Sequence, residues 1–346
     1  MDSKQIINIK PLGFTWATRD PFLFCVHHLD NYPAGNEQLG PAASLEGRNL
    51  GQDFTIKDGW RMYHGEKIPG FPAHPHRGFE TVTVVLKGFV DHSDSHGAAG
   101  RYGNGDVQWM TAGSGLQHSE MFPLIKKDEA NPLEIFQIWL NLPKSKKFCR
   151  PHFAMLWAED IPVYSEIDKN GKATEVTVIA GKIGNVTAPA PAPDSWAADV
   201  NNALGIWLIR LEAHAQWTMP QATIEVNRSL YFYRGLDITI AGIPVMPYHS
   251  VELTADQSVV LENGDIDAFL LLLQGNPIGE PVVQHGPFVM NNAAEIQEAF
   301  HDYRKTQFGG WPWTRFDNVH SGNIGRFARY ADGREEIKNQ IIQKNE

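Results

Sequence analysis

The sequence predicts an all-β protein built from two tandem β-barrels, and three observations lead to this prediction. The chain has 346 residues, which suggests two domains at about 100–200 residues each, with one large closed barrel as the alternative. It contains 31 Gly and 22 Pro together with 18 Phe, 9 Tyr and 10 Trp, which is typical of many short strands joined by turns. Since 42% of the residues are hydrophobic and 20% are charged, the chain can bury a substantial core.

Strand signals fill the first part of the chain, and we assign an N-terminal barrel to residues 1–158. β-Branched residues dominate residues 81–86, and residues 107–111 follow an Asn-Gly-Asp turn signal. Residues 133–140 alternate well enough to form a further strand. No helical period separates these segments, which favours a β-barrel or sandwich.

A second barrel is predicted over residues 159–291. Its expected strands cover residues 176–180, 204–211, 229–233, 238–240 and 268–273. Lys87-Gly88 of the first part resembles Arg234-Gly235, and the Asn-Gly-Asp turn at 104–106 recurs at 263–265. This self-similarity supports two related barrels.

The last part, residues 292–346, is predicted to be a helix and a polar tail. Asn292 is a plausible N-cap, and apolar residues recur near helical spacing through residue 304. We also expect a short surface helix at residues 335–343.

Charge and composition exclude several classes of function. The net charge of −10, with no long basic run, argues against direct nucleic-acid binding, because neutralising phosphates requires clustered cations. The longest apolar stretch, residues 268–273, is far below the roughly 18 residues that span a bilayer, so we expect no membrane partner. The chain has two cysteines and no apolar signal segment at its start, which favours a reduced, cytoplasmic protein.

Two short motifs predict a metal site. Side chains at i and i+2 of a strand point the same way, so His74 and His76 present two imidazoles to one face. His118 and Glu120 likewise present an imidazole and a carboxylate. If both faces line the barrel interior, these four side chains suit Fe(II), Mn(II), Ni(II), Cu(II) or Zn(II). The absence of thiolate argues against a closed structural zinc site.

Glu80 and Arg77 lie beside this motif and allow more than one interpretation. Glu80 follows His76 by four residues, so strand alternation would place it on the same face, where it could coordinate the metal. It could equally pair with Arg77 or accept a hydrogen bond from a ligand imidazole. We favour this outer role for both residues.

Other residues near the motifs are weaker candidates. His92 and His96 lie in a Gly/Asp/Ser-rich segment that we expect to be a solvated loop. Four apolar residues flank the proposed ligands and are candidates for a substrate pocket: Phe71, Phe79, Trp109 and Met110.

The tandem alignment predicts that the second barrel lacks this metal site. Equal steps from Gly235 and Gly264 lead to the counterparts of His74, His76, Glu80, His118 and Glu120, which are Gln221, Thr223, Asn227, Pro277 and Gly279. None of the five is a strong metal ligand. We therefore expect this barrel to serve packing or regulation.

At these residues the sequence resembles the pirin family of the cupin superfamily. The resemblance is carried by His-Pro-His-Arg-Gly-Phe-Glu-Thr at 74–81, by residues 105–115 and by His-Ser-Glu at 118–120. It implies a bicupin, two cupin barrels with a single metal, usually iron, in the N-terminal one. It places the ligands at His74, His76, His118 and Glu120 and leaves Glu80 outside the set.

The resemblance implies two alternative functions. One is a metal-dependent dioxygenase of the quercetin 2,3-dioxygenase type, whose partners are a small aromatic, enediol-like substrate and O2. We expect the metal to bind and acidify a substrate hydroxyl, and Glu120 to take its proton as general base. The other is a non-enzymatic, iron-dependent regulatory module that docks a protein partner.

Overall fold

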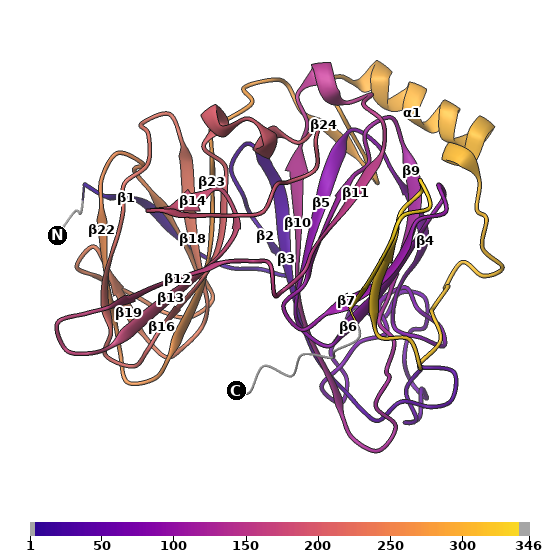
Figure 1. Ribbon diagram of the computed structural model, residues 1–346, viewed down its shortest axis with the longest axis horizontal. Helices are drawn as coiled ribbons and strands as arrows, with labels where there is room; N and C mark the ends of the chain where they lie inside the picture. Colours follow the sequence, from indigo (N-terminus) through magenta and orange to yellow (C-terminus); the bar gives the residue numbers. More distant parts are fainter. Residues whose placement is uncertain (1–3, 339–346) are drawn as a thin grey trace. The chain divides into compact units, whose positions relative to one another are not determined.

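The computed structural model describes residues 4–338 and shows a mostly β protein with one α-helix in that range, as predicted (Figure 1). Contacts group the chain into two compact units. We call one unit the first barrel; it comprises His27–Ile138, Leu142–Ala158 and residues 280–338. The other unit, the second barrel, comprises residues 4–26, Trp139–Asn141 and Glu159–Gly279. The domain limits at 158/159 and 291/292 stay predictions.

Two antiparallel six-stranded sheets form around the core that contains the predicted metal ligands. One has the order β11-β8-β5-β10-β3-β2 and the other β27-β26-β7-β6-β9-β4. Their strands are β2 (Thr15–Trp16), β3 (Phe22–Tyr32), β4 (Gly70–His76), β5 (Phe79–Lys87), β6 (Phe89–Asp94), β7 (Ala99–Gly103), β8 (Val107–Thr111), β9 (Leu116–Met121), β10 (Asn131–Asn141), β11 (His152–Leu156), β26 (Arg326–Arg329) and β27 (Glu335–Lys338).

The central strand β5 shows why these residues form a sheet. Its Thr and Val residues favour extended backbone, and seven of its nine residues are buried because both faces of the strand are covered. Gly78 and Gly88 bound it with positive φ angles, a conformation that residues with a Cβ rarely adopt. Turns at these two glycines therefore fix where the strand begins and ends.

The second barrel combines a seven-stranded sheet, β1-β21-β18-β23-β16-β13-β12, with a four-stranded sheet, β17-β22-β19-β20. An apolar cluster that includes Val178, Trp217 and Leu261 lies between them. Its strands are β1 (Ile6–Pro11), β12 (Val163–Ile167), β13 (Ala173–Ala180), β16 (Gly205–Leu211), β17 (Gln216–Met219), β18 (Asn227–Arg234), β19 (Ile238–Ile240), β20 (Ile243–Val245), β21 (His249–Leu253), β22 (Val259–Asn263) and β23 (Ala268–Gly275). Two small hairpins complete the strands, β14 (Lys182–Ile183) with β15 (Val186–Thr187) and β24 (Val283–His285) with β25 (Phe288–Met290).

The α-helix, α1, covers Ala293–Thr306 (Figure 1). At its N-terminus the Asn292 side chain accepts a hydrogen bond from the Glu295 backbone. The predicted surface helix at 335–343 is wrong where the structure describes it. Glu335–Lys338 form β27, which pairs with β26, and β26 pairs with β7. Residues 339–343 of that prediction lie outside the described residues.

Candidate metal centre

Strands β4 and β9 bring three histidines together. The strands pair antiparallel, with His74 directly opposite His118 and Phe71 opposite Glu120. One nitrogen from each of His74, His76 and His118 lies within 4.8 Å of the other two. The imidazole centroids are 4.5 to 4.9 Å apart. These distances allow one metal ion to bind all three rings.

A glycine makes this close pairing possible. Gly70 begins β4 with a φ of +129°, and a Cβ at this position would lie 2.5 Å from the Glu120 carbonyl oxygen. A larger residue would therefore push β4 away from β9 at the level of the predicted carboxylate ligand.

The three imidazoles are electrically neutral. Burial lowers the pKa of His74 to about 4 and places the pKa values of His76 and His118 well below the usual value. Repulsion among the rings adds to the effect at His76 and His118. A metal binds neutral imidazole, so these rings need lose no proton on metal binding near pH 7.

Hydrogen bonds aim the ring nitrogens at the centre. Nδ1 of His74 donates to the Pro72 carbonyl at 2.9 Å, and Nδ1 of His76 donates to the Pro287 carbonyl at 3.4 Å. In a neutral ring this leaves Nε2 as a lone-pair donor to a metal. Both nitrogens of buried His118 lack a hydrogen-bond partner among the described residues. A metal ion fits this set because it would bind the lone pair of one of those two buried nitrogens.

Glu120 lies beside the triad. Its Oε2 is 3.7 Å from His118 Nε2. Thr83 Oγ1 lies 2.9 Å from its Oε1, and Gln137 Nε2 donates to its Oε2 at 3.1 Å. Burial raises the pKa of Glu120, and hydrogen bonds from these neighbours oppose that rise. Of the four predicted ligands, three histidines therefore converge and the carboxylate adjoins them.

Glu80 does not lie on the face of the sheet that His76 occupies, so this part of the prediction is wrong. Gly78 turns the chain between β4 and β5, so the alternation does not continue through it. Within β5, Glu80 and Thr83 are three residues apart and face opposite sides of the sheet, while Thr83 faces Glu120. The Glu80 carboxylate accepts a hydrogen bond from Thr111 at 2.6 Å on that other side.

Arg77 is directed toward the helix and tail. Its guanidinium donates to the Ser114 carbonyl at 2.7 Å and to Asp302 at 2.9 Å. It also lies over the Phe308 ring, 4.5 Å from the centroid. These contacts tie the residue after His76 to α1 and the segment that follows it.

The four predicted pocket residues do not share one location. Phe71 packs edge-on to His74, with centroids 6.4 Å apart, and Phe79 packs in the same way against His76 at 5.1 Å. Met110 and Trp109 are adjacent in β8 and so face opposite sides. Trp109 shares the face of Glu80, away from the triad, because β8 and β5 pair without a bulge. Trp109 is near the proposed ligands in the sequence, but the direction of its side chain is set by the pairing of β8 with β5.

His92 is a residue of the centre that sequence reasoning missed. It was expected in a solvated loop, but it lies fully buried in β6, directly opposite Glu120. Its ring is 5.6 Å from the His118 ring and stacks on Phe153 at 5.3 Å. The strand signal was present in the sequence as Phe89-Val90, one step before the polar residues. His96, at the turn that follows, is exposed as expected.

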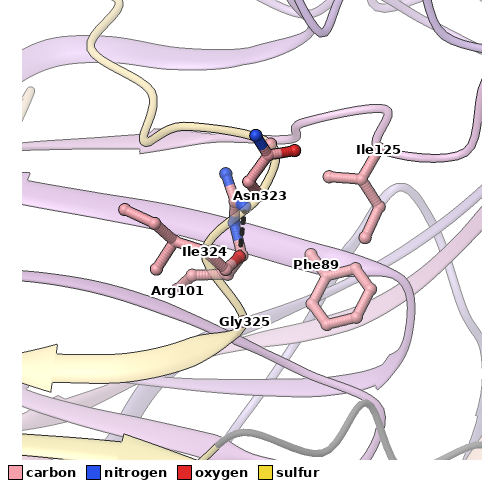
Figure 2. Close-up of a pocket in the computed structure, with 7 residues that line it drawn as sticks. Phe89, Arg101, Ile125, Asn323, Ile324 and Gly325 are labelled. Atoms are coloured by element: carbon pink, nitrogen blue, oxygen red, sulfur yellow. Dashed lines mark hydrogen bonds between the residues drawn. The ribbon is translucent and has the colours of Figure 1, made fainter.

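A separate cavity of about 170 Å³ lies in the first barrel between β6, β7 and residues 322–325 (Figure 2). Arg101 lies at its wall and makes five hydrogen bonds, two to buried Asp91 and three to the carbonyls of His320, Ser321 and Ile324. Since a guanidinium has five N–H groups, Arg101 has no donor left for a ligand. The residue fastens the tail to the barrel.

Comparisons with known proteins identify the family. Residues 16–140 match the family model described as Pirin, and residues 206–309 match the Pirin C-terminal cupin domain. A Pseudomonas aeruginosa protein named "Putative quercetin 2,3-dioxygenase" is 37% identical over 243 residues, covering 69% of this chain and 79% of that protein. Pirin of Mus musculus is 36% identical over 254 residues, covering 71% of this chain and 80% of its own.

The fold has a close counterpart among solved structures. The crystal structure of quercetin 2,3-dioxygenase from Acinetobacter baumannii matches with a TM-score of 0.68 and 25% identity, covering 89% of this chain and 99% of that one. Within residues 4–338, no helix is long and apolar enough to cross a membrane. Both cupin domains are present, in the order that the resemblance implied. The chain belongs to the pirin family.

Proposed function

We propose that this chain is a metal-dependent dioxygenase that opens an aromatic, enediol-like ring, as in quercetin 2,3-dioxygenase. The observation that carries the proposal is the histidine triad, buried at His76 and His118, whose neutral rings direct unprotonated nitrogens at one point. The names of similar proteins from Pseudomonas and Acinetobacter support the substrate class.

We propose Fe(II) as the metal, held by His74, His76 and His118, with Glu120 as the fourth donor. Three imidazoles and one carboxylate suit a first-row divalent ion and leave positions open for substrate; Mn, Ni, Cu or Zn would fit the same donors. When bound, the ion would act as a Lewis acid toward a substrate hydroxyl and as a redox centre for O2.

The chain's own residues prepare the proton transfer. Glu120, beside the triad, is the carboxylate placed to accept the hydroxyl proton as general base. Thr83 and Gln137 hold the carboxylate in place. Phe71 and Phe79 pack against the ligand imidazoles, and the half-buried Phe71 offers apolar surface to a planar ring, whereas Phe79 is fully buried.

The test is an aerobic incubation of iron-loaded protein with quercetin, together with elemental analysis of the protein as purified. We expect one metal ion per chain and a loss of the visible absorbance of quercetin. His76→Ala should lose both the metal and the turnover. Full bound iron in His76→Ala would contradict the ligand assignment. An inert wild-type protein that co-purifies with a specific protein would favour the regulatory module instead.

A further inference from the structure

The second barrel buries an arginine that lacks most of its hydrogen bonds. Arg228 in β18 is 1% exposed. Its Nη2 donates to the Pro220 carbonyl at 2.7 Å, whereas Nε and Nη1 have no partner among the described residues. Burial lowers the pKa of Arg228 to about 10, and no carboxylate opposes this. A buried charge without a counter-ion is strongly unfavourable, so the arrangement calls for an acceptor.

Other buried arginines among the described residues have a carboxylate partner. Arg61 faces Asp30, Arg101 faces Asp91 and Arg326 faces Asp106, each through a hydrogen-bonded ion pair. Each of these carboxylates is itself buried. Arg228 therefore departs from the way in which the same chain neutralises a buried guanidinium.

Strand register gathers further unpaired polar atoms around Arg228. Gln274 in β23 lies directly opposite Arg228, and Trp207 in β16 lies diagonally across from Gln274. Gln274 Oε1 and Trp207 Nε1 are buried and also lack partners among the described residues. Directly opposite Cβ atoms are about 5 Å apart and diagonal neighbours about 7–8 Å apart, within reach of side chains this long.

All three side chains face the inside of the barrel. Arg228 is two residues from Leu230 in β18, and Gln274 is two residues from Leu272 in β23, so each pair shares one face. Both leucines and Trp207 belong to the apolar core of this barrel. A guanidinium, an indole N–H and an amide therefore lie together against the apolar core of this barrel.

A short exposed segment, residues 220–225, contacts Arg228. Residues 220, 221 and 223–225 are exposed, and Ile224 is 71% exposed. Among the described residues, the carbonyl of Pro220 at the start of this segment is the one hydrogen-bond partner of the Arg228 side chain. An anionic ligand that displaces this segment would replace the hydrogen bond between Arg228 and the Pro220 carbonyl with an ion pair to Arg228.

We propose that this end of the second barrel binds a small oxyanion, a carboxylate or a phosphate group, through Arg228 and Trp207. Gln274 Oε1 then accepts a hydrogen bond from a hydroxyl group of the ligand. Guanidinium matches the geometry of both anions, and its hydrogen bonds to them are among the strongest that side chains make. The site needs no metal and stands apart from the proposed dioxygenase activity.

The experiment measures anion binding by the full chain. Acetate, glycolate and inorganic phosphate are titrated by calorimetry, and thermal unfolding is followed at matched ionic strength with chloride as the reference. We expect saturable 1:1 binding of at least one probe, with a midpoint of unfolding that rises with its concentration. Binding of phosphate alone would assign a phosphoryl ligand, and stronger binding of glycolate than of acetate would assign a hydroxy acid.

The key variant is Arg228→Met, and its matched control is Arg234→Met at the exposed end of the same strand. Arg228→Met should weaken binding at least tenfold and should be no less stable than wild type in chloride, because it removes an uncompensated buried charge. Arg234→Met should bind normally. If Arg228→Met does not fold, Gln274→Leu serves in its place and should abolish the preference for glycolate. No binding of any probe, or binding unchanged in Arg228→Met, would overturn the proposal.

Discussion

The two barrels of this protein leave opposite kinds of polar atoms unpaired in their interiors. The first barrel buries neutral imidazoles whose free lone pairs can bind a cation. The second buries a guanidinium whose free N–H groups can bind an anion. Since desolvated polar atoms are unfavourable until they gain a partner, each barrel is suited to a ligand of the opposite character.

The difference arises from a few positions on a common framework. Thr81 lies seven residues before Gly88, and Arg228 lies seven residues before Gly235, so these two residues correspond. The segments before them carry His74 and His76 in one barrel and Gln221 and Thr223 in the other. The fold therefore supplies similar strands, and the side chains at these positions determine the charge of the ligand.

Removing a ligand should have the largest effect. His118→Ala takes away the imidazole with two unpaired nitrogens, so we expect loss of bound metal and a fall of turnover to background. Metal content and quercetin consumption measure this. His214→Ala, an exposed histidine of the second barrel, is the control and should match wild type. Normal metal content in His118→Ala would show that His118 is not a metal ligand, and the proposed difference between a cation-binding first barrel and an anion-binding second barrel would then lose its basis.

The base should come next. Glu120→Gln keeps the side-chain shape but cannot take a proton, so we expect kcat to fall by about 10²–10⁴-fold. Elemental analysis should separate this effect from metal loss. The control is Glu80→Gln, on the opposite face of the sheet, which should retain kcat within a few-fold. Equal losses in both variants would show that Glu120 has no special role in proton transfer.

The same substitution should have very different effects at Arg101 and at Arg228. Arg101→Met leaves the buried Asp91 carboxylate without its ion-pair partner and releases three tail carbonyls, so we expect a loss of about 3–5 kcal/mol in the free energy of unfolding. Arg228→Met should cost nothing in the absence of a bound anion. Urea unfolding of both variants measures the difference. Similar losses in the two would mean that Arg228 is already satisfied.

The sequence allowed the fold class to be predicted, together with the residues of the triad. His74 with His76, and His118 with Glu120, each lie within one strand, so alternation is a local property that the sequence records. The predicted direction of the Glu80 side chain was wrong because the turn at Gly78 interrupts the alternation of side chains. Side chains at i and i+2 share a face only when both residues lie in the same strand.

Features that depend on long-range pairing could not be predicted. His92 enters the centre because β6 pairs with β9, although the polar residues around it resemble a loop. Residues 335–338 form a strand because β26 offers them an edge, and nothing in their own sequence requires it. The unpaired state of Arg228 could not be predicted, because the sequence around an arginine in a strand does not show whether a distant carboxylate will pair with it.

Lys147 is a further buried cation, and its substitution has the smallest predicted effect. It is 1% exposed, and its Nζ donates to the carbonyls of Gly78 at 2.8 Å and Val289 at 3.1 Å, whereas two of the three nitrogens of Arg228 lack a partner among the described residues. Burial lowers its pKa from 10.5 to about 8, while Glu280 and Glu295 oppose the shift. Between these pH values the unfolded chain binds more protons than the folded chain, so stability should rise with pH.

We therefore expect the free energy of unfolding of wild type, relative to that of Lys147→Met, to increase by up to about 3 kcal/mol from pH 8 to 10.5. Urea unfolding across this pH range measures the difference. Lys144→Met, at an exposed lysine three residues away, is the matched control and should show no such slope. A pH-independent difference between wild type and Lys147→Met would mean that the two carbonyls hold the ammonium as well as water does. Carbonyl groups alone would then suffice to bury a cation in this fold, and the unpaired state of Arg228 would need no anion to explain it.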